Sequence, residues 1–251
     1  MYYQYAEIPV GNGVIRGSAV MPEAGGKYPS VIFMHGFTVD STGPNRFHLH
    51  FARRAVEAGF CCIRFDFYGC GESDGEFYEM TVGSEQRDAA AIMEWARKQP
   101  FVDAENLFLG GHSMGGLVTA LVSPTVRPKA IFTWSVAMNM PYQAGWRTRT
   151  MKGPTERGWD IEGLELSRAY MEEVVSLDFQ ELAKDYPGDV LLVHGSADTD
   201  CPVDGSRILR HVYGNRARLH VIAEADHRML SIPWREECYA VTLDFLKKHI
   251  C

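Results

Sequence analysis

Two serines lie in a Gly-x-Ser-x-Gly pattern, which is one of the settings in which a serine hydroxyl can act as a nucleophile. Ser113 stands in Gly111-His-Ser-Met-Gly115, and Ser73 stands in Gly71-Glu-Ser-Asp-Gly75. Such a nucleophile needs a buried strand before it and a helix after it, so that a sharp turn exposes the hydroxyl at the helix N-terminus. An apolar run precedes Ser113 and the helix-like Met114–Val122 follows it, whereas turn residues flank Ser73. We therefore predict that Ser113 is the nucleophile and that Ser73 lies in a loop.

His227 is the candidate for the base that must take the proton of the serine hydroxyl. It lies four residues past the strand-like run Arg218–Ala223, in the loop before the last predicted helix. Loops at the carboxyl ends of parallel strands are where such sheets carry their chemistry. Other histidines beside predicted strands are expected to complete turns or to pack near the site: His35, His112 and His194.

Asp198 is the candidate for the acid that orients His227 and stabilises its charged form. In a strand–turn–helix site of this kind, the acid lies at another strand end, between the serine and the histidine in chain order. Asp198 comes three residues after the apolar run Val190–Gly195, close enough to that strand end to be held firmly. Asp200 and Asp204 remain alternatives, with solvated turns or helix caps as their other roles.

The tetrahedral intermediate of acyl transfer also needs two N–H donors for its oxyanion. The backbone N–H of Met114, the residue after the predicted nucleophile, is expected to be the first donor. The second donor should come from the loop after the buried strand Ser30–His35. Gly36 allows a tight turn there, so the backbone N–H of Phe37 is the predicted second donor.

Short apolar runs alternate with helix-like stretches along most of the chain, which predicts an α/β fold with a mostly parallel sheet wrapped by helices on both faces. The predicted strands are Val14–Val20 (antiparallel, from its alternation), Ser30–His35, Phe60–Asp66, Asn106–Gly110, Lys129–Ser135, Val190–His194 and Arg218–Ala223. The predicted helices are Pro44–Ala58, Thr81–Lys98, Met114–Val122, Val203–Tyr213 and Pro233–His249.

The segment from Val136 to about Pro187 has no buried-strand pattern, although Gly163–Val175 has the pattern of a helix. Connections of this length are uncommon in compact domains and often form lids. We therefore predict a cap or lid subdomain at 136–187, inserted into a core made of residues 1–135 and 188–251.

The side chains in and near this insert allow two interpretations. One group is either a slot for a flat acyl group or the cap's own small core, because aromatic side chains dominate both: Trp134, Met138, Met140, Tyr142 and Trp146. A basic group is expected to form a solvated face: Arg147, Arg149, Lys152 and Arg157.

The composition excludes several classes of protein. The chain has 251 residues, 46% of them hydrophobic and 23% charged, which is typical of a globular domain. A net charge of −7 argues against a nucleic-acid partner, which would need a basic face. No secretory leader and no membrane span is predicted, and the six cysteines are expected to be thiols. We expect a soluble, cytoplasmic protein, with a homodimer left open.

Several motifs together make this sequence similar to the α/β-hydrolase family over nearly the whole chain. They are His35-Gly-Phe, Asp66-Phe-Tyr-Gly-Cys-Gly-Glu-Ser73, Gly111-His-Ser-Met-Gly-Gly116, His194-Gly-Ser-Ala-Asp198 and Ala225-Asp-His227. Within that family the sequence resembles bacterial feruloyl (cinnamoyl) esterases, which have a similar length, a similar segment at Gly71–Thr81 and a cap of about this size. This resemblance implies hydrolysis of esters of hydroxycinnamic acids.

The resulting hypothesis is a serine carboxylic-ester hydrolase that acts on a small-molecule ester and needs neither a cofactor nor a metal. An esterase or a monoglyceride-type lipase for aliphatic acyl chains is the main alternative. An acyl-peptidase, a thioesterase and a haloperoxidase activity on the same three residues are further alternatives. A non-catalytic binding protein is the alternative from a different class, because a fold does not fix a function.

Overall fold

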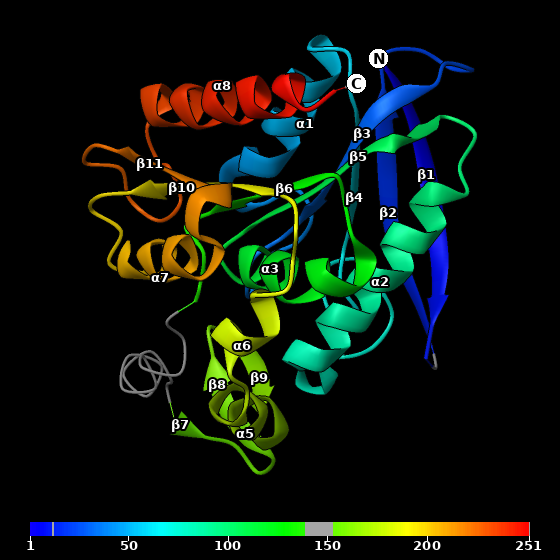
Figure 1. Ribbon diagram of the computed structural model, residues 1–251. Coiled ribbons are helices and arrows are strands. Elements are labelled where there is room, and N and C mark those ends of the chain that lie inside the picture. The colour runs from blue at the N-terminus through cyan, green and yellow to red at the C-terminus, as the bar shows by residue number, and fades with distance from the viewer. Residues whose placement is uncertain (12, 139–152, 251) are drawn as a thin grey trace.

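Eight strands form one large sheet in the computed structural model of the protein, which describes residues 1–11, 13–138 and 153–250 (Figure 1). In their order across the sheet, the strands are β1 (Tyr2–Val10), β2 (Gly13–Met21), β4 (Cys61–Phe65), β3 (Tyr28–Met34), β5 (Val102–His112), β6 (Ala130–Trp134), β10 (Asp189–Gly195) and β11 (Ala217–Ile222). β2 pairs antiparallel with β1 and with β4, and the other neighbours are parallel. The predicted α/β fold with a mostly parallel sheet is confirmed.

Helices cover both faces of this sheet (Figure 1). On one face lie α1 (Phe47–Glu57) and α8 (Ile232–Lys248), and on the other lie α2 (Val82–Arg97), α3 (Met114–Val126) and α7 (Asp204–Tyr213). Short 3-10 helices occur at Pro44–Arg46, Phe77–Glu79 and Gly214–Arg216. The long helices and buried strands predicted from the sequence are present, with ends that differ by a few residues.

Strand β3 shows why continuous apolar runs mark the centre of the sheet. Successive side chains of a strand point to opposite faces, so Val31 and Phe33 pack below α1 and α8, and Ile32 and Met34 pack on the side of α2 and α3. A strand that is buried on both faces must therefore be apolar at every position. The edge strand β1 gave no such pattern, because Ile8 is the one buried side chain in it.

Residues 153–187 of the predicted cap form a small unit beside α3. It contains a three-stranded antiparallel sheet of β7 (Gly153–Pro154), β8 (Gly158–Ile161) and β9 (Leu164–Ser167), followed by α5 (Arg168–Ser176) and α6 (Phe179–Ala183). The helix predicted over Gly163–Val175 is wrong in its first part, because β9 occupies those residues. The Ser167 hydroxyl caps α5 by accepting from Tyr170 N at 3.1 Å. The boundaries of the cap stay a prediction.

Part of the predicted aromatic slot and basic group lies outside the described residues: Met140, Tyr142, Trp146, Arg147, Arg149 and Lys152. Arg157, at the end of the basic group, is exposed and pairs with Glu165. Trp134 does not line a slot in the structure. Its ring packs 4.7 Å from that of Phe33 below α1, and its Nε1 donates to Thr242 Oγ1 of α8 at 3.0 Å. It belongs to the core of the sheet, because it comes at the end of β6 and points to that face.

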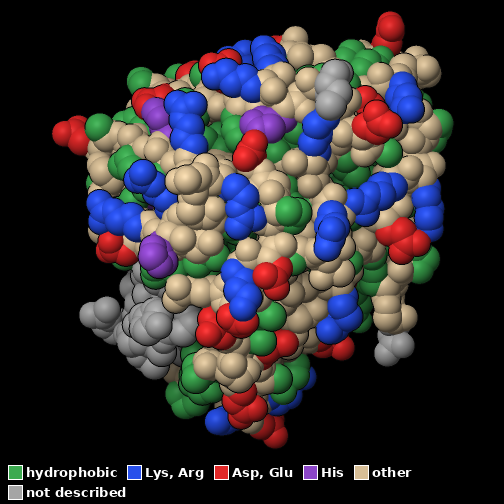
Figure 2. All heavy atoms as spheres, viewed as in Figure 1, with side chains coloured by type: hydrophobic (Ala, Val, Ile, Leu, Met, Phe, Trp, Pro, Cys, Tyr) green, Lys and Arg blue, Asp and Glu red, His purple; other side chains and the backbone are tan. Residues whose placement is uncertain are grey.

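The surface is mixed in charge on the side seen in Figure 2, where basic and acidic side chains are interspersed. Among the described residues, no helix is both long enough and apolar enough to cross a bilayer.

The buried carboxyl of Asp88 on α2 gives a prediction about stability. Burial raises the pKa of Asp88 to about 6, although Tyr68 N donates to its carboxylate at 2.9 Å. Because this pKa is raised in the folded state, the protonated carboxyl stabilises the fold at low pH, and this stability is lost as the pH rises from about 4 to above 6.

We therefore expect Asp88→Asn to raise the free energy of unfolding at pH 7 by about 1–2 kcal/mol, and the gain to vanish at about pH 4. Asparagine keeps an acceptor for Tyr68 N and carries no charge. Urea unfolding at the two pH values measures the difference, and the exposed Asp185→Asn serves as the control. A gain of equal size at both pH values would contradict the assignment.

Candidate active site

Ser113 lies on a sharp turn between β5 and α3. Its backbone has φ 56° and ψ −115°, which costs a non-glycine residue on the order of 1–3 kcal/mol. The turn is fixed by a hydrogen bond from Ser113 N to Trp134 O at 2.8 Å. Glycines allow the close packing: a Cβ on Gly111 would lie 2.3 Å from the Gly115 backbone, and one on Gly115 would lie 2.3 Å from Met34 O. The local structure is the strand–turn–helix that the sequence predicted.

The structure brings His227 and Asp198 to Ser113 from two other strand ends. His227 lies in the loop between β11 and α8, and Asp198 follows β10. His227 Nε2 is 3.0 Å from Ser113 Oγ, and His227 Nδ1 is 2.8 Å from Asp198 Oδ2. Ser113 and Asp198 are buried, and the His227 side chain is 13% exposed. The three side chains form one hydrogen-bonded chain that solvent reaches at the histidine.

The Asp198 carboxylate is held by several donors. Its Oδ1 accepts from Cys201 N at 2.7 Å and from Asp200 N at 3.0 Å, and its Oδ2 lies near His194 Nε2 as well as His227 Nδ1. Burial by itself would raise the pKa of Asp198, but the hydrogen bonds from His194 and His227 outweigh it and hold the pKa well below its usual range. Asp198 is therefore ionised at neutral pH.

The alternative acids lie elsewhere. Asp200 contributes its backbone N–H to Asp198, and Asp204 pairs with Arg207 at 2.8 Å on the exposed start of α7. Asp226, next to His227 in the chain, accepts two backbone N–H groups of its own turn. Within the described part of the chain, the carboxylate that bonds to the His227 imidazole is that of Asp198 and not one of these three.

The loop after β3 approaches the serine closely. A Cβ on Gly36 would lie 3.3 Å from Ser113 Cβ, which places the neighbouring Phe37 beside the nucleophile turn. Met114 is the first residue of α3. The two predicted oxyanion donors thus come from segments that meet at Ser113, and their role stays a prediction.

Two buried histidines lie behind His227. His112 Nε2 is 2.8 Å from His227 O, and His112 Nδ1 is 3.2 Å from His48 Nε2. Because a carbonyl only accepts, His112 carries its proton on Nε2, and its Nδ1 accepts from His48. His48 Nδ1 is then a bare acceptor, and among the described residues it has no partner. Burial and the charge of His227 lower the pKa of His112 to about 3, so that it is neutral at pH 7.

Two further side chains at the site were not predicted from the sequence. Cys201 Sγ lies 4.0 Å from Ser113 Oγ, and the Tyr170 hydroxyl of α5 donates to Met114 Sδ at 3.9 Å. The Phe37 ring packs 5.4 Å from the Tyr170 ring. A residue of the insert therefore lies against both predicted oxyanion segments. The only feature of the sequence that pointed to Tyr170 was its place in an unusually long connection between predicted strands.

Ser73, the second serine of the Gly-x-Ser-x-Gly pattern, lies in the loop after β4. Its hydroxyl donates to Asp66 O at 2.7 Å and accepts from Arg16 N at 2.9 Å. The bond to Asp66 O lies within the loop after β4, and the bond from Arg16 N ties that loop to β2. Ser73 is structural, as its flanking residues predicted.

A family model adds an independent observation to this geometry. The model of the prolyl oligopeptidase family matches residues 46–251. The chain belongs to the prolyl oligopeptidase family. Members of this family are α/β hydrolases, which agrees with the resemblance found in the motifs. The matched region of this family member includes Ser113, Asp198 and His227, whereas Phe37 precedes it.

Two proteins similar in sequence to this prolyl oligopeptidase family member are an uncharacterized protein and a thioesterase. An uncharacterized 31.7 kDa protein of Escherichia coli is 38% identical over 97 residues, which are 38% of this chain and 32% of that protein. The mitochondrial palmitoyl-protein thioesterase ABHD10 of Bos taurus is 26% identical over 209 residues, which are 82% of this chain and 63% of that protein. The matched part of the chain thus covers about a third of the length of the Escherichia coli protein and less than two thirds of the length of ABHD10.

Solved structures similar to this family member share its fold over almost the whole length. The structure of Est1E from Butyrivibrio proteoclasticus with ferulic acid bound has a TM-score of 0.85 at 25% identity, covering 97% of this chain and 98% of that one. The mouse alpha/beta hydrolase domain-containing protein 10 has a TM-score of 0.73 at 18% identity, covering 98% of this chain and 99% of that one.

Proposed function

We propose that the protein is a serine carboxylic-ester hydrolase in which Ser113 is the nucleophile, His227 the base and Asp198 the acid. The observation that carries the proposal is the chain of two hydrogen bonds, 3.0 Å from Ser113 Oγ to His227 Nε2 and 2.8 Å from His227 Nδ1 to Asp198 Oδ2. A base within hydrogen-bond reach of a hydroxyl, itself oriented by a carboxylate, is what activation of a serine requires.

In the proposed reaction, His227 Nε2 takes the proton of Ser113 as Oγ attacks the ester carbonyl. The backbone N–H groups of Phe37 and Met114 stabilise the oxyanion. Asp198 fixes the proton on His227 Nδ1 and stabilises the imidazolium. His227 then protonates the departing alcohol, and water, deprotonated by His227, hydrolyses the acyl-enzyme.

For the acyl group we propose a hydroxycinnamate such as the feruloyl group. The likeness to Est1E with bound ferulic acid supports this substrate class. Phe37 is half-buried beside the nucleophile turn and packs 5.2 Å from the buried Phe77 and 5.4 Å from the buried Tyr170, measured between ring centroids. Its ring is the aromatic contact proposed for a flat acyl group, because aromatic side chains bind such groups through large contact areas.

Acyl thioesters or aliphatic esters are the second candidate class. The likeness to the palmitoyl-protein thioesterase ABHD10 supports it. The same three residues would act on either class, because the serine attacks the acyl carbonyl and His227 protonates whichever group leaves.

A panel of matched substrates tests these proposals. It contains methyl ferulate, aliphatic p-nitrophenyl esters of increasing chain length, a palmitoyl thioester and a prolyl peptide amide. We expect the highest kcat/KM on methyl ferulate. A higher kcat/KM on long-chain acyl substrates than on methyl ferulate would contradict the hydroxycinnamate proposal and favour the second class of substrates. Turnover of none of them, with no labelling by a fluorophosphonate, would favour a non-catalytic protein.

The histidine pair gives a prediction about positioning. His112 holds the backbone carbonyl of His227, so His112→Leu should displace the base and lower kcat by about tenfold to a hundredfold with KM little changed. His112→Gln should restore most of the rate, because glutamine offers an N–H near the place of Nε2. Steady-state kinetics on both variants measure this, and equal losses in the two would contradict the role of that hydrogen bond.

A further inference from the structure

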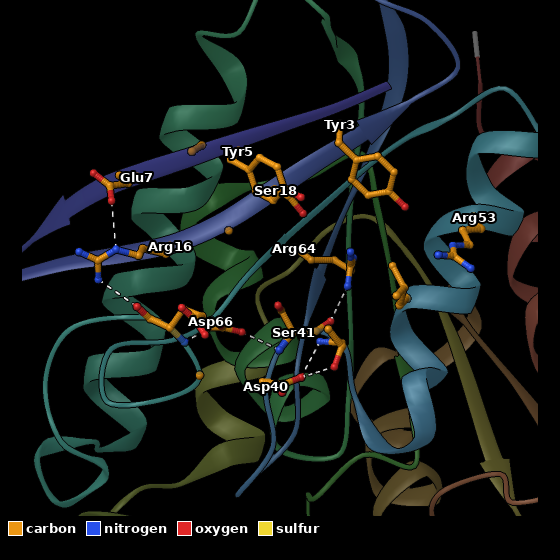
Figure 3. A pocket seen from close by; sticks show the side chains of 16 residues that line it. Tyr3, Tyr5, Glu7, Arg16, Ser18, Asp40, Ser41, Arg53, Arg64 and Asp66 are labelled. Atoms are coloured by element: carbon orange, nitrogen blue, oxygen red, sulfur yellow. Dashed lines mark hydrogen bonds and ion pairs between the residues drawn. The ribbon is translucent and has the colours of Figure 1, made fainter. Parts of the chain in front are cut away.

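A groove of about 1230 Å³ opens between the β1–β2 hairpin, α1 and the loop after β3, and none of the predicted catalytic residues lines it (Figure 3). Tyr3 and Tyr5 come from β1, Ser18 from β2, Arg64 from β4 and Arg53 from α1. Figure 3 shows Tyr3, Arg64 and Arg53 directed into the same part of this groove.

Arg64 is the unusual group in this groove. It is only 4% exposed, and its Nη1 donates to Ser41 O at 2.8 Å. Its Nε has no hydrogen-bond partner, and within the described part of the chain no carboxylate forms an ion pair with it. Burying a guanidinium whose N–H donors lack acceptors costs free energy, and an anion that accepts from those donors would offset the cost.

Three of the four carboxylates that line the groove are engaged by other groups, and the fourth, that of Glu72, lies at one end. Both oxygens of Asp66 accept backbone N–H groups, at 2.7 and 2.9 Å. Asp40 Oδ1 accepts two N–H groups of its own turn, and Glu7 pairs with Arg16 at 3.0 Å. Glu72 lies at the Arg16 end, since Arg16 donates to its backbone carbonyl. The acidic groups therefore gather at one end or are bound to the backbone.

Two arginines, Arg53 and Arg64, lie toward the opposite end of the groove, and among the described residues no carboxylate forms an ion pair with either. Arg53 forms no ion pair among the described residues, whereas its neighbour Arg54 pairs with Glu57 and Glu236 at 3.1 and 3.0 Å. Tyr3 lies beside them, and Tyr5, which is 82% exposed, stands one pleat further along β1.

We propose that this end of the groove binds a phosphate or carboxylate group carried by an aromatic ring. The guanidinium groups of Arg64 and Arg53 would bind the oxyanion, because guanidinium donors match the geometry of both anions. The Tyr3 and Tyr5 rings would bind the ring of the ligand, since aromatic side chains supply flat apolar contact area. The site is separate from Ser113, so its occupancy does not depend on catalysis.

Calorimetric titration at constant ionic strength tests the proposal with three probes: phenyl phosphate, benzoate and inorganic phosphate. Ser113→Ala protein is titrated alongside the wild type, so that binding at the nucleophile is recognised by its difference. We expect saturable binding of phenyl phosphate or benzoate with a Kd of about 1 mM or below, unchanged in Ser113→Ala. Whichever of phenyl phosphate and benzoate has the lower Kd identifies the preferred anion. Inorganic phosphate is expected to bind at least about threefold more weakly than that ligand, because it lacks the aromatic ring.

Two neighbouring arginines give a matched pair of variants. Arg53→Gln should weaken binding at least about tenfold, because a charge-assisted hydrogen bond is lost, and Arg54→Gln should leave the Kd unchanged. Arg64→Gln should abolish binding; if it unfolds, the Arg53 and Arg54 pair still decides. Absence of saturable binding up to about 20 mM, or an equal effect of the two α1 variants, would overturn the proposal.

Discussion

Ser113→Ala is expected to lower kcat/KM on the best ester by at least about 10⁴-fold, while the protein stays folded. The loss is large because the substitution removes the attacking atom itself. The fold should persist because the hydrogen bond that fixes the turn comes from the backbone, from Ser113 N to Trp134 O at 2.8 Å. Initial rates and thermal unfolding of the same preparation measure the two effects.

Ser73→Ala is the matched control, since it changes the same residue type in the same five-residue pattern. It removes contacts to Asp66 O and Arg16 N, so it should lower the melting temperature and leave labelling by a fluorophosphonate intact. Labelling should be lost in Ser113→Ala. Retention of labelling in that variant would mean that another residue is the nucleophile.

The sequence predicted the parts of the site whose signals are local. A buried strand, a turn rich in glycine and a helix surround Ser113 within a short span, and each element could be recognised from its own residues. His227 and Asp198 were predicted in the same way, because each follows an apolar run that ends at the carboxyl edge of the sheet. The fold then brings together side chains separated by 114 and 29 residues.

The parts that could not be predicted depend on contacts between distant segments. Nothing in the residues around His48 shows that its ring meets His112, which is 64 positions away. Trp134 was placed either in a slot or in the core of the cap because it precedes the insert, but the face to which it points follows from the pairing of β6 in the sheet. The strands β8 and β9 were missed because strands of four residues are too short to show a period.

The helix predicted at Gly163–Val175 illustrates a related difficulty. Its residues have a helical spacing of apolar side chains, yet Leu164–Ser167 pairs with β8 and the helix begins only after Ser167. Pairing with a neighbouring strand outweighed the local pattern, and tertiary context commonly overrides propensity in this way. The cap sheet is therefore a product of strand pairing more than of local sequence.

Asp198→Asn is expected to lower kcat by about 10⁴-fold, with little change in the position of the side chain. Asp198 Oδ1 accepts from Cys201 N at 2.7 Å and Asp200 N at 3.0 Å, so an asparagine must keep its oxygen there and turn its amide NH₂ toward His227. His227 Nδ1 then accepts instead of donating, and the proton moves to Nε2. That nitrogen can no longer take the proton of Ser113.

Asp200→Asn is the control for this prediction, because it makes the same change two residues away and should leave kcat within about threefold of the wild type. A second readout separates the electrostatic role from a structural one. Because the pKa of Asp198 is lowered in the folded state, its charge stabilises the protein above about pH 4, and this contribution is lost as the pH falls further. Asp198→Asn should therefore flatten the acid limb of the stability profile. If kcat falls equally in both variants, the acid assigned to His227 is wrong.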